Sequence, residues 1–431
     1  MNITEVFVDN LINKSQKIPE KVTKQSRKVL LDYLGVVSGG MRFLEEKHPE
    51  LIASTPKSAF LKGFAAHILE LDDGHRRGMI HLGASIISSL LMITEKESLT
   101  GTYLLRGIVM GYEVAVRCAC ALQPGHKKRG YHVSGTCGTI GAALGIAFAC
   151  GYSREQIKST LACAVSSAAG LLEIQEQASE LKPYNLGRAA QDGIMAAQIG
   201  KLAIPGPEDI LGGKRGLLAA LTETPNPEFF TDFYGENYCI EGVYQKVHAA
   251  CRHCHPAIDA TISLRNDIHL EPEQIERIEV HTYLLAIGSH DHTQVIGVSS
   301  AKLSTPYAVA LTIVNGSAGY ADYNENNLGN SIIKMLTNKV CIIEDEYLTA
   351  QSPAIRGARV SIYMKDGNSY EASCMYPKGE PENPLTNEEL EEKFRSLAMY
   401  GGLTLMECDE LIHEIWKLEI NLNKILNIVC K

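Results

Sequence analysis

The spacing of apolar residues changes near residue 243, and this change restricts the folds open to the chain. Before it, apolar residues recur with the period of a helix, as in Val29–Val37 and Leu104–Leu122. The other predicted helical runs of this half are Ala84–Thr94, Gly135–Cys150, Arg154–Leu172 and Ala189–Leu202. After it, apolar and polar residues alternate, which is typical of half-buried strands. We therefore expect a helical part followed by a mixed part.

Alternating stretches in the second part predict strands. Ile275–Tyr283, Arg359–Met364 and Ser369–Met375 all show this alternation. Lys365–Asn368 joins the last two and contains Asp-Gly, which is a strong signal for a hairpin turn. The sequence thus predicts a sheet that contains at least one hairpin.

The helical pattern returns after Pro384, with Thr386 as the expected N-cap of the next helix. A chain of 431 residues is too long for one ordinary core, so two domains are expected. We predict a mainly α protein with an α+β domain. Residues 1–243 and 386–431 form a large all-helical domain, and residues 244–385 form a smaller inserted α+β lid domain.

Composition and charge exclude several classes of function. The formal net charge is −9, and no basic tract is long enough to suggest a nucleic-acid partner. The N-terminus lacks the features of a signal peptide, and the twelve cysteines are scattered, several of them in Ala-rich runs. Gly135–Gly151 carries no charge, but its Gly, Ala, Thr and Cys content predicts a buried helix rather than a membrane span. We expect a cytoplasmic protein with reduced thiols and no membrane partner.

Polar groups gather at the end of the apolar run Phe64–Leu71. Glu70-Leu-Asp-Asp-Gly-His75 is followed by His81, and His132 precedes a Gly/Ala-rich helix. Buried charges are costly unless they are paired or used in chemistry. A helix N-terminus lowers the pKa of a nearby imidazole, so His81 and His132 are candidates for proton transfer. The alternative is that both histidines only hydrogen-bond helix ends and that the aspartates form a salt-bridge cluster.

Cationic side chains mark two further segments. Lys182 and Arg188 lie around a predicted helix start, where a bound anion would relieve their repulsion with the helix dipole. A solvated loop is the alternative. Further along the chain, Lys246, Arg252 and His255 are expected to contribute to an anion pocket.

The segment around Arg252 also permits a zinc site, because Cys251-x-x-Cys254 has ligand spacing and His248 and His255 are close. A structural zinc site usually has a second ligand pair some distance away, whereas these candidates fall within eight residues. We therefore expect no metal. The chain also lacks a Walker loop, a dinucleotide-binding glycine loop and a G-x-S-x-G elbow, so no nucleotide cofactor is expected.

Tyr307 follows Ser304-Thr-Pro at the start of an apolar helix. A tyrosine in this setting is usually part of the core with its hydroxyl hydrogen-bonded. It can also serve as an acid or as an oxygen-binding group, so Tyr307 is kept as a candidate catalytic residue.

Together these motifs resemble the MmgE/PrpD superfamily, which includes 2-methylcitrate dehydratase, cis-aconitate decarboxylase and iminodisuccinate epimerase. The resemblance covers nearly the whole chain. It rests on six ordered motifs: Glu70–His75 with His81; Tyr131-His132 before Thr136–Ala143; Lys182–Ala190; Lys246 with Cys251-Arg252 and His255–Ala260; Ser304–Tyr307; and Pro377–Pro384.

The resemblance implies a cofactor-free enzyme, usually a homodimer, whose active site lies between a large helical domain and a smaller lid. The active-site residues of the family correspond here to Asp73, His81, His132, Lys182, Lys246 and Tyr307, together with His255. Two departures from the usual Asp-Phe-Asp-Asp-Thr motif matter. Glu70 replaces the first Asp, and Gly74 replaces the Thr, so the Thr hydroxyl that contacts substrate is absent. This puts 2-methylcitrate and cis-aconitate themselves in doubt as substrates.

We expect an acid–base enzyme acting on a small di- or tricarboxylate, as a dehydratase or decarboxylase. A histidine moves a proton beside a carboxylate, while Lys182, Lys246 and Arg252 hold the substrate. An epimerase needs the same groups and stays open, as does a non-catalytic zinc- or ligand-binding helical protein. The residues alone do not assign the acid and the base between His81 and His132.

Overall fold

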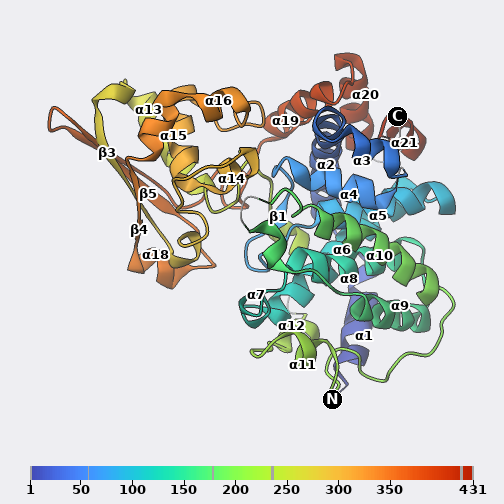
Figure 1. Ribbon diagram of the computed structural model, residues 1–431. Helices are drawn as coiled ribbons and strands as arrows, with labels where there is room; N and C mark the ends of the chain where they lie inside the picture. Colours follow the sequence, from blue (N-terminus) through green and yellow to red (C-terminus); the bar gives the residue numbers. More distant parts are fainter. Residues whose placement is uncertain (1, 57, 177–178, 234–236, 418–420, 430–431) are drawn as a thin grey trace.

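The computed structural model describes all residues except 1, 57, 177–178, 234–236, 418–420 and 430–431. It shows a mainly helical protein with a small mixed sheet, as the sequence predicts. One lobe holds helices from both ends of the chain, and the sheet lies in the other lobe (Figure 1). The lobe boundaries at residues 243/244 and 385/386 stay predictions.

The described residues of the large lobe form helices and loops, apart from one short strand pair. Its helices are α1 (Ile3–Ser15), α2 (Glu20–Lys47), α3 (Pro49–Ser54), α4 (Ala59–Ile68), α5 (Gly83–Glu97), α6 (Gly101–Leu122), α7 (Gly125–Lys128), α8 (Val133–Ala149), α9 (Arg154–Ser166), α10 (Tyr184–Gly200), α11 (Leu217–Leu221), α12 (Glu228–Thr231), α19 (Asn387–Tyr400), α20 (Leu405–Trp416) and α21 (Leu422–Val429).

Helix α8 is the buried centre of this lobe, as its small residues predict. All of its residues are buried. A Cβ added to Gly145 would lie 2.9 Å from the carbonyl oxygen of Gly107 on α6, so glycine is needed for the two helices to approach this closely. No helix among the described residues combines the length and apolar character needed to cross a bilayer.

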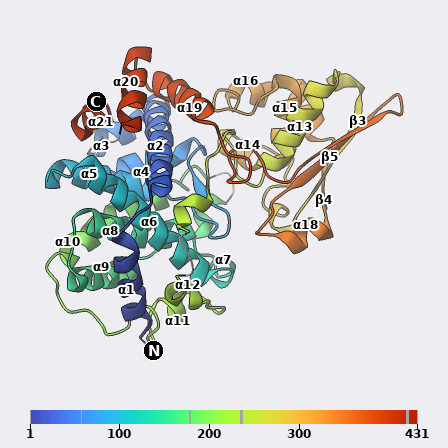
Figure 2. The same cartoon turned by 180° about the vertical axis from the view of Figure 1, so that it is seen from behind.

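The C-terminal helices pack back against the N-terminal part of the chain (Figure 2). Thr386 is the N-cap of α19 and forms a capping box with Glu389, which confirms the predicted helix start. Lys393 on α19 donates to Asp32 on α2 at 2.6 Å, and the same α2 packs against Phe394 through Gly35. The two ends of the sequence therefore share one core.

The smaller lobe is built on a four-stranded sheet in the order β4-β3-β5-β6. Its strands are β3 (Ile275–Thr282), β4 (Val340–Glu344), β5 (Ala358–Met364) and β6 (Ser369–Cys374). The helices of this lobe are α13 (His255–Asp267), α14 (Val298–Leu303), α15 (Thr305–Asn315), α16 (Glu325–Gly329), α17 (Ser331–Thr337) and α18 (Glu346–Gln351). The predicted hairpin is confirmed as β5–β6, and β4 pairs in parallel with β3.

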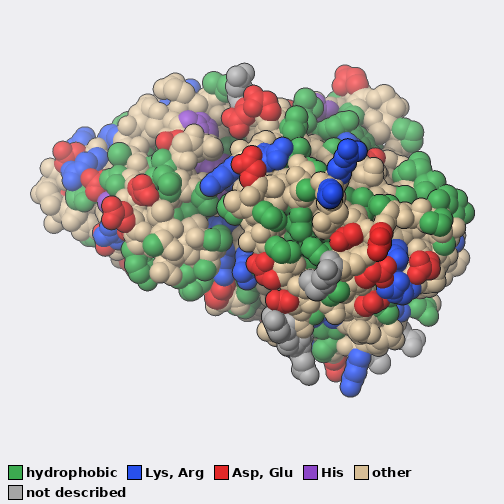
Figure 3. All heavy atoms as spheres, turned by 90° about the horizontal axis from the view of Figure 1, so that it is seen from below, with side chains coloured by type: hydrophobic (Ala, Val, Ile, Leu, Met, Phe, Trp, Pro, Cys, Tyr) green, Lys and Arg blue, Asp and Glu red, His purple; other side chains and the backbone are tan. Residues whose placement is uncertain are grey.

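A short antiparallel ladder joins β1 (Gly74–His75) to β2 (Val243–Tyr244), close to where the two lobes meet. It brings the histidine-rich turn of the large lobe beside the segment that leads into the smaller one. On the face seen from below, acidic and basic side chains are interspersed rather than gathered into one extended basic patch (Figure 3).

Candidate active site

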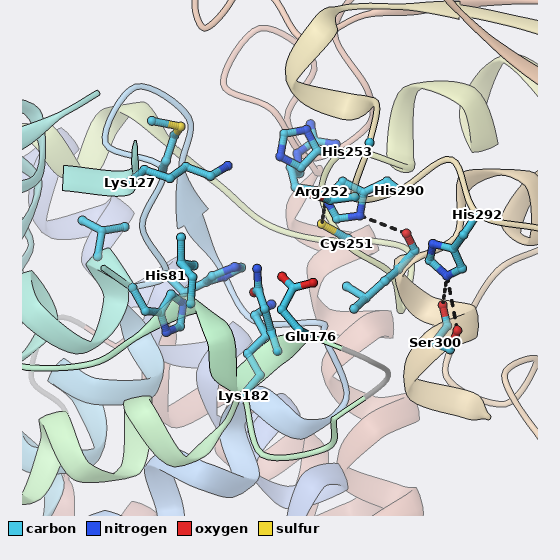
Figure 4. Close-up of a pocket in the computed structure, with 18 of the residues that line it drawn as sticks. His81, Lys127, Glu176, Lys182, Cys251, Arg252, His253, His290, His292 and Ser300 are labelled. Atoms are coloured by element: carbon cyan, nitrogen blue, oxygen red, sulfur yellow. Dashed lines mark hydrogen bonds between the residues drawn. The ribbon is translucent and has the colours of Figure 1, made fainter. Parts of the chain in front are cut away.

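A cavity of about 350 Å³ is lined by both lobes. His81, His132 and Lys182 line it from the large lobe, and Arg252 lies on the opposite side (Figure 4). Four of the eight site residues predicted from the sequence are therefore brought to one cavity. The other four, Asp73, Lys246, His255 and Tyr307, are not among the residues that line it.

His255 and Tyr307 lie in the interior of the smaller lobe. The Nε2–H of His255 donates to the carbonyl oxygen of Ala250 at 3.2 Å, and its ring packs 5.0 Å from that of His248. The Tyr307 hydroxyl is buried without a hydrogen-bond partner among the described residues, and its ring lies 6.1 Å from that of Tyr323. The structure thus gives these two residues no direct access to the cavity.

Asp73 holds the start of helix α5. One carboxylate oxygen accepts the backbone N–H of Gly83 at 2.8 Å, and the other accepts the Tyr112 hydroxyl at 2.6 Å. An anion at a helix N-terminus is stabilised by the helix dipole. Burial nevertheless raises the pKa of Asp73 from 3.8 to about 6, against the effect of these two hydrogen bonds. Asp73 therefore positions the turn that carries His81.

The raised pKa predicts a pH-dependent contribution to stability. The folded state binds this proton more tightly than the unfolded chain, so the contribution of Asp73 is fully present below pH 3.8 and is lost as pH rises through about 6. Asp73→Asn keeps the shape and removes the titration. Between pH 5 and pH 7.5, its free energy of unfolding should gain about 1–2 kcal/mol relative to wild type. Urea unfolding measures this, and an equal difference at both pH values would contradict it.

The hydrogen bonds of His81 fix its tautomer. Its Nδ1–H donates to the carbonyl oxygen of Asp73 at 2.9 Å, and a carbonyl can only accept. Its Nε2 makes no hydrogen bond within the described part of the chain and keeps a lone pair. Asp72 lies 3.3 Å from Nδ1 and also accepts from His67 at 2.8 Å. Burial alone would raise the pKa of Asp72, but His67 and His81 hold it below its usual range, so Asp72 stays an anion. His81 is thus arranged as a base, with the anionic Asp72 beside its Nδ1–H.

His132 has the opposite tautomer. Its Nδ1 accepts from the amide nitrogen of Asn185 at 2.9 Å, and that nitrogen also donates to the carbonyl oxygen of Leu171 at 3.2 Å. The second bond fixes the amide orientation, because a carbonyl must face the nitrogen. Burial, and then the charge of Lys182, lower the pKa of His132 well below its usual range, so the ring is neutral. A neutral ring that accepts at Nδ1 carries its proton at Nε2 and acts as a donor.

Glu70 already forms ion pairs with two lysines that the sequence assigned to an anion pocket. Lys182 donates to one oxygen of Glu70 at 2.5 Å, and Lys246 donates to the other at 2.9 Å. Burial alone would raise the pKa of Glu70, but the two ammonium groups hold it well below its usual range. Glu70 adopts a positive φ of 57°, an uncommon conformation for a residue with a side chain. The anion expected beside Lys182 is therefore a side chain of this protein.

Other cations remain available to a ligand. Lys127 and Arg356 line the cavity, and Lys127 forms no ion pair with another described residue. Burial, followed by the charge of Arg356, lowers the pKa of Lys127. Arg252 donates from Nε to Glu380 at 3.1 Å and from Nη2 at 2.5 Å, while its buried Nη1 has no partner in the described structure. These three groups are candidates for holding substrate carboxylates.

The zinc set suggested by the sequence does not assemble. The sulfur of Cys254 accepts a hydrogen bond from the Thr305 hydroxyl at 3.4 Å, and His248 pairs with Asp259 at 2.6 Å. Cys251 instead lies beside His290, with Sγ 3.7 Å from Nε2 (Figure 4). Burial alone would raise the pKa of Cys251, but His290 lowers it to about 5.

Comparison with known families accounts for both lobes. The MmgE/PrpD N-terminal domain model matches residues 48–229, and the MmgE/PrpD C-terminal domain model matches residues 248–418. The chain belongs to the MmgE/PrpD family. This confirms the family predicted from the ordered motifs.

Relatives of this MmgE/PrpD protein match along nearly their whole length. The "Cis-aconitate decarboxylase-like protein oryM" of Aspergillus oryzae is 24% identical over 429 residues, which covers 89% of this chain and 88% of the relative. The "Cis-aconitate decarboxylase" of Homo sapiens is 23% identical and covers 92% of this chain and 88% of its own. The mouse protein of the same name is also 23% identical, with 92% and 87% covered.

The structure explains why this MmgE/PrpD chain has glycine at position 74. A Cβ added to Gly74 would lie 2.4 Å from the hydroxyl oxygen of Tyr244, and Tyr244 also lines the cavity. A threonine cannot fit there while Tyr244 keeps this position. The departure from the family motif therefore lies opposite a tyrosine on the facing strand.

Several cavity groups were not predicted from the sequence. Lys127, Arg356 and His290 belong to no motif recognised in the sequence. His290 lies between η4 (Leu284–Ala286) and α14, in a segment without regular periodicity. No pattern in one sequence indicates that such loop residues face a cavity, whereas Asp72 and Glu70 were visible within the polar cluster.

Proposed function

We propose that this protein is a lyase that acts on a small di- or tricarboxylate, as a dehydratase or a decarboxylase. The observation that carries the proposal is the opposite tautomers of His81 and His132 at one cavity, with Lys127, Arg252 and Arg356 on its walls. A base and a hydrogen-bond donor are then present together at one cavity. The names of the relatives support a carboxylate substrate.

In the proposed mechanism, the cationic walls bind the carboxylates and His81 Nε2 removes a proton from the adjacent carbon. The electron pair left on carbon is delocalised into the bound carboxylate, whose negative charge the cations stabilise. In a dehydration, His132 Nε2–H hydrogen-bonds the departing hydroxyl, which leaves as water with the proton that His81 removed. In a decarboxylation, the C–C bond breaks first, CO2 leaves, and a solvent proton carried by His81 Nε2 is transferred to the resulting carbanion, while His132 Nε2–H hydrogen-bonds the substrate. Neither route needs a metal or nucleotide cofactor. The homodimer and the cytoplasmic location stay predictions.

Proton NMR in D2O with cis-aconitate, citrate, 2-methylcitrate and malate tests the proposal. New olefinic signals from citrate, 2-methylcitrate or malate support a dehydratase, and conversion of cis-aconitate with release of CO2 supports a decarboxylase. Deuterium incorporation at carbon without net turnover would instead support the epimerase alternative. Absence of both turnover and exchange across a wider panel of polycarboxylates would contradict the proposal.

The tautomer of His132 provides a test that needs no substrate. Nitrogen-15 NMR of imidazole-labelled protein should show His132 protonated at Nε2 near pH 7. Asn185→Asp should move the proton to Nδ1, because a carboxylate can only accept, and kcat should fall by about 10²–10⁴. His126 is a matched internal reference, since its Nδ1–H donates to the carbonyl of Leu221 in both proteins. A wild-type His132 protonated at Nδ1 would contradict the assignment of the donor.

A further inference from the structure

Cys251, His253 and His290 form a compact cluster on the cavity wall that faces His81 (Figure 4). One ligand atom from each, a sulfur or a ring nitrogen, lies within 4.8 Å of the other two. Zinc binds thiolate sulfur at about 2.3 Å and imidazole nitrogen at about 2.1 Å, so tetrahedral geometry separates the two by about 3.6 Å. The observed separation between Cys251 Sγ and His290 Nε2 is 3.7 Å. The pair needs almost no movement to coordinate one ion.

Each imidazole has a hydrogen-bond partner at its Nδ1, as metal-binding histidines usually do at the nitrogen that does not bind the metal. The Nδ1–H of His290 donates to the carbonyl oxygen of Leu303 at 2.9 Å, which leaves Nε2 with its lone pair. Nδ1 of His253 lies 2.7 Å from the Tyr283 hydroxyl, which can accept its proton. The two rings stack with their centroids 4.8 Å apart. The ligand atoms are therefore close together, and a turn of the His253 ring out of this stack would let both imidazoles reach one ion beside Cys251.

We propose that Cys251, His253 and His290 form a zinc site with its fourth coordination position open to the cavity. Three protein ligands with an open position are typical of zinc sites that bind water or a small anion. Lys127, Arg252 and Arg356 surround the same cavity, so they weaken binding of the bare cation and favour an anion, such as a carboxylate, as the fourth ligand.

The site goes beyond the proposed function, whose proton transfers use the opposite wall. A zinc ion here would occupy space in the substrate cavity, so it is expected to inhibit rather than support turnover. The other group of metal-ligand side chains, His67, Glu70 and His81, is a weaker candidate because Glu70 is already bound to Lys182 and Lys246.

Titration of EDTA-stripped, reduced protein with zinc, in competition with a chromophoric chelator, tests the site. Wild type should bind one zinc ion per chain at this site. Loss of a residue that hydrogen-bonds a metal ligand lowers metal affinity by about 10–100-fold. Cys251→Ser and His290→Ala each remove a ligand itself, so each should lower zinc affinity by at least that much. Tyr283→Phe removes only the partner of His253 and should cost about tenfold. Circular dichroism confirms that each variant is folded.

Cys254→Ser is the matched control, because Cys254 is the other cysteine of the C-x-x-C pair and lies outside the cluster. It should bind zinc as wild type does. Cobalt(II) should give a sulfur-to-metal absorption band in wild type and Cys254→Ser, and none in Cys251→Ser. Equal losses in both cysteine variants, an unchanged affinity in Cys251→Ser, or no zinc bound by wild type would each overturn the proposal. The titration uses no substrate, so it stands apart from the test of the lyase.

Discussion

Replacing His81 with alanine should lower kcat/KM by about 10²–10⁴ and leave the fold intact. The loss follows from removing the cavity-lining ring whose Nε2 is unbonded and whose Nδ1 lies 3.3 Å from the anionic Asp72. The fold should survive because Asp72 keeps its hydrogen bond from His67 and Asp73 keeps those from Gly83 and Tyr112. Steady-state kinetics on the substrate identified by NMR, with thermal melting in parallel, measure both quantities.

His132→Ala should cause a loss of similar size, since it removes the donor. Asp73→Asn should cost less, because Asp73 positions the turn and does not face the cavity. The control is His292→Ala: this ring also lies at the cavity wall but is bound to Ser300 at 3.2 Å. Its kcat/KM should change by a few-fold at most. If His81→Ala turned over substrate like this control, the assignment of the base would be wrong.

Replacing Glu70 with glutamine should destabilise the protein by about 3–5 kcal/mol, the usual cost of leaving a buried charge uncompensated. The Glu70 carboxylate is the shared partner of Lys182 and Lys246, and Lys246 is 1% exposed. Glutamine keeps the length of the side chain but carries no charge, so both ammonium groups lose their anionic partner. Urea unfolding at neutral pH measures the loss.

A double variant distinguishes lost pairing from lost packing. Glu70→Gln combined with Lys246→Met removes the more deeply buried cation as well, so much of the stability should return; Lys182 can still reach the cavity. Glu176→Gln is the matched control, since Glu176 lines the same cavity, is exposed and has no ion pair among the described residues. A double variant no more stable than Glu70→Gln alone would show that the cost does not come from unpaired lysines.

The periodic parts of the fold were predictable, because apolar spacing reports directly which face of an element is buried. Helices α2, α5, α6, α8 and α10, the β5–β6 hairpin and the Thr386 cap follow from local patterns, whereas α9 ends at Ser166, short of the predicted Leu172. Strand β4 was not predicted, since Val-Cys-Ile-Ile-Glu is short and does not alternate clearly. Its register beside β3 is set by a parallel pairing between segments that are far apart in the chain.

The sequence predicted several residues of the candidate site but not the hydrogen-bond and ion-pair partners of their side chains. His81 and His132 were recognised because each precedes a helix. Their tautomers depend on the Asp73 carbonyl and on Asn185, and the second contact spans 53 residues of sequence. Glu70 meets its two lysines across 112 and 176 residues, so only the folded chain shows that the lysines are already paired.

The contact between Gly74 and Tyr244 links two sequence positions whose side chains constrain each other. Introducing the family's threonine at 74 alone would push against the Tyr244 hydroxyl, and shortening Tyr244 alone would open a gap at the cavity. Neighbouring positions of this kind are strongly non-additive. A route, natural or engineered, toward threonine at position 74 must therefore displace or shorten Tyr244 first, and the effect of each change on substrate preference is expected to depend on the other.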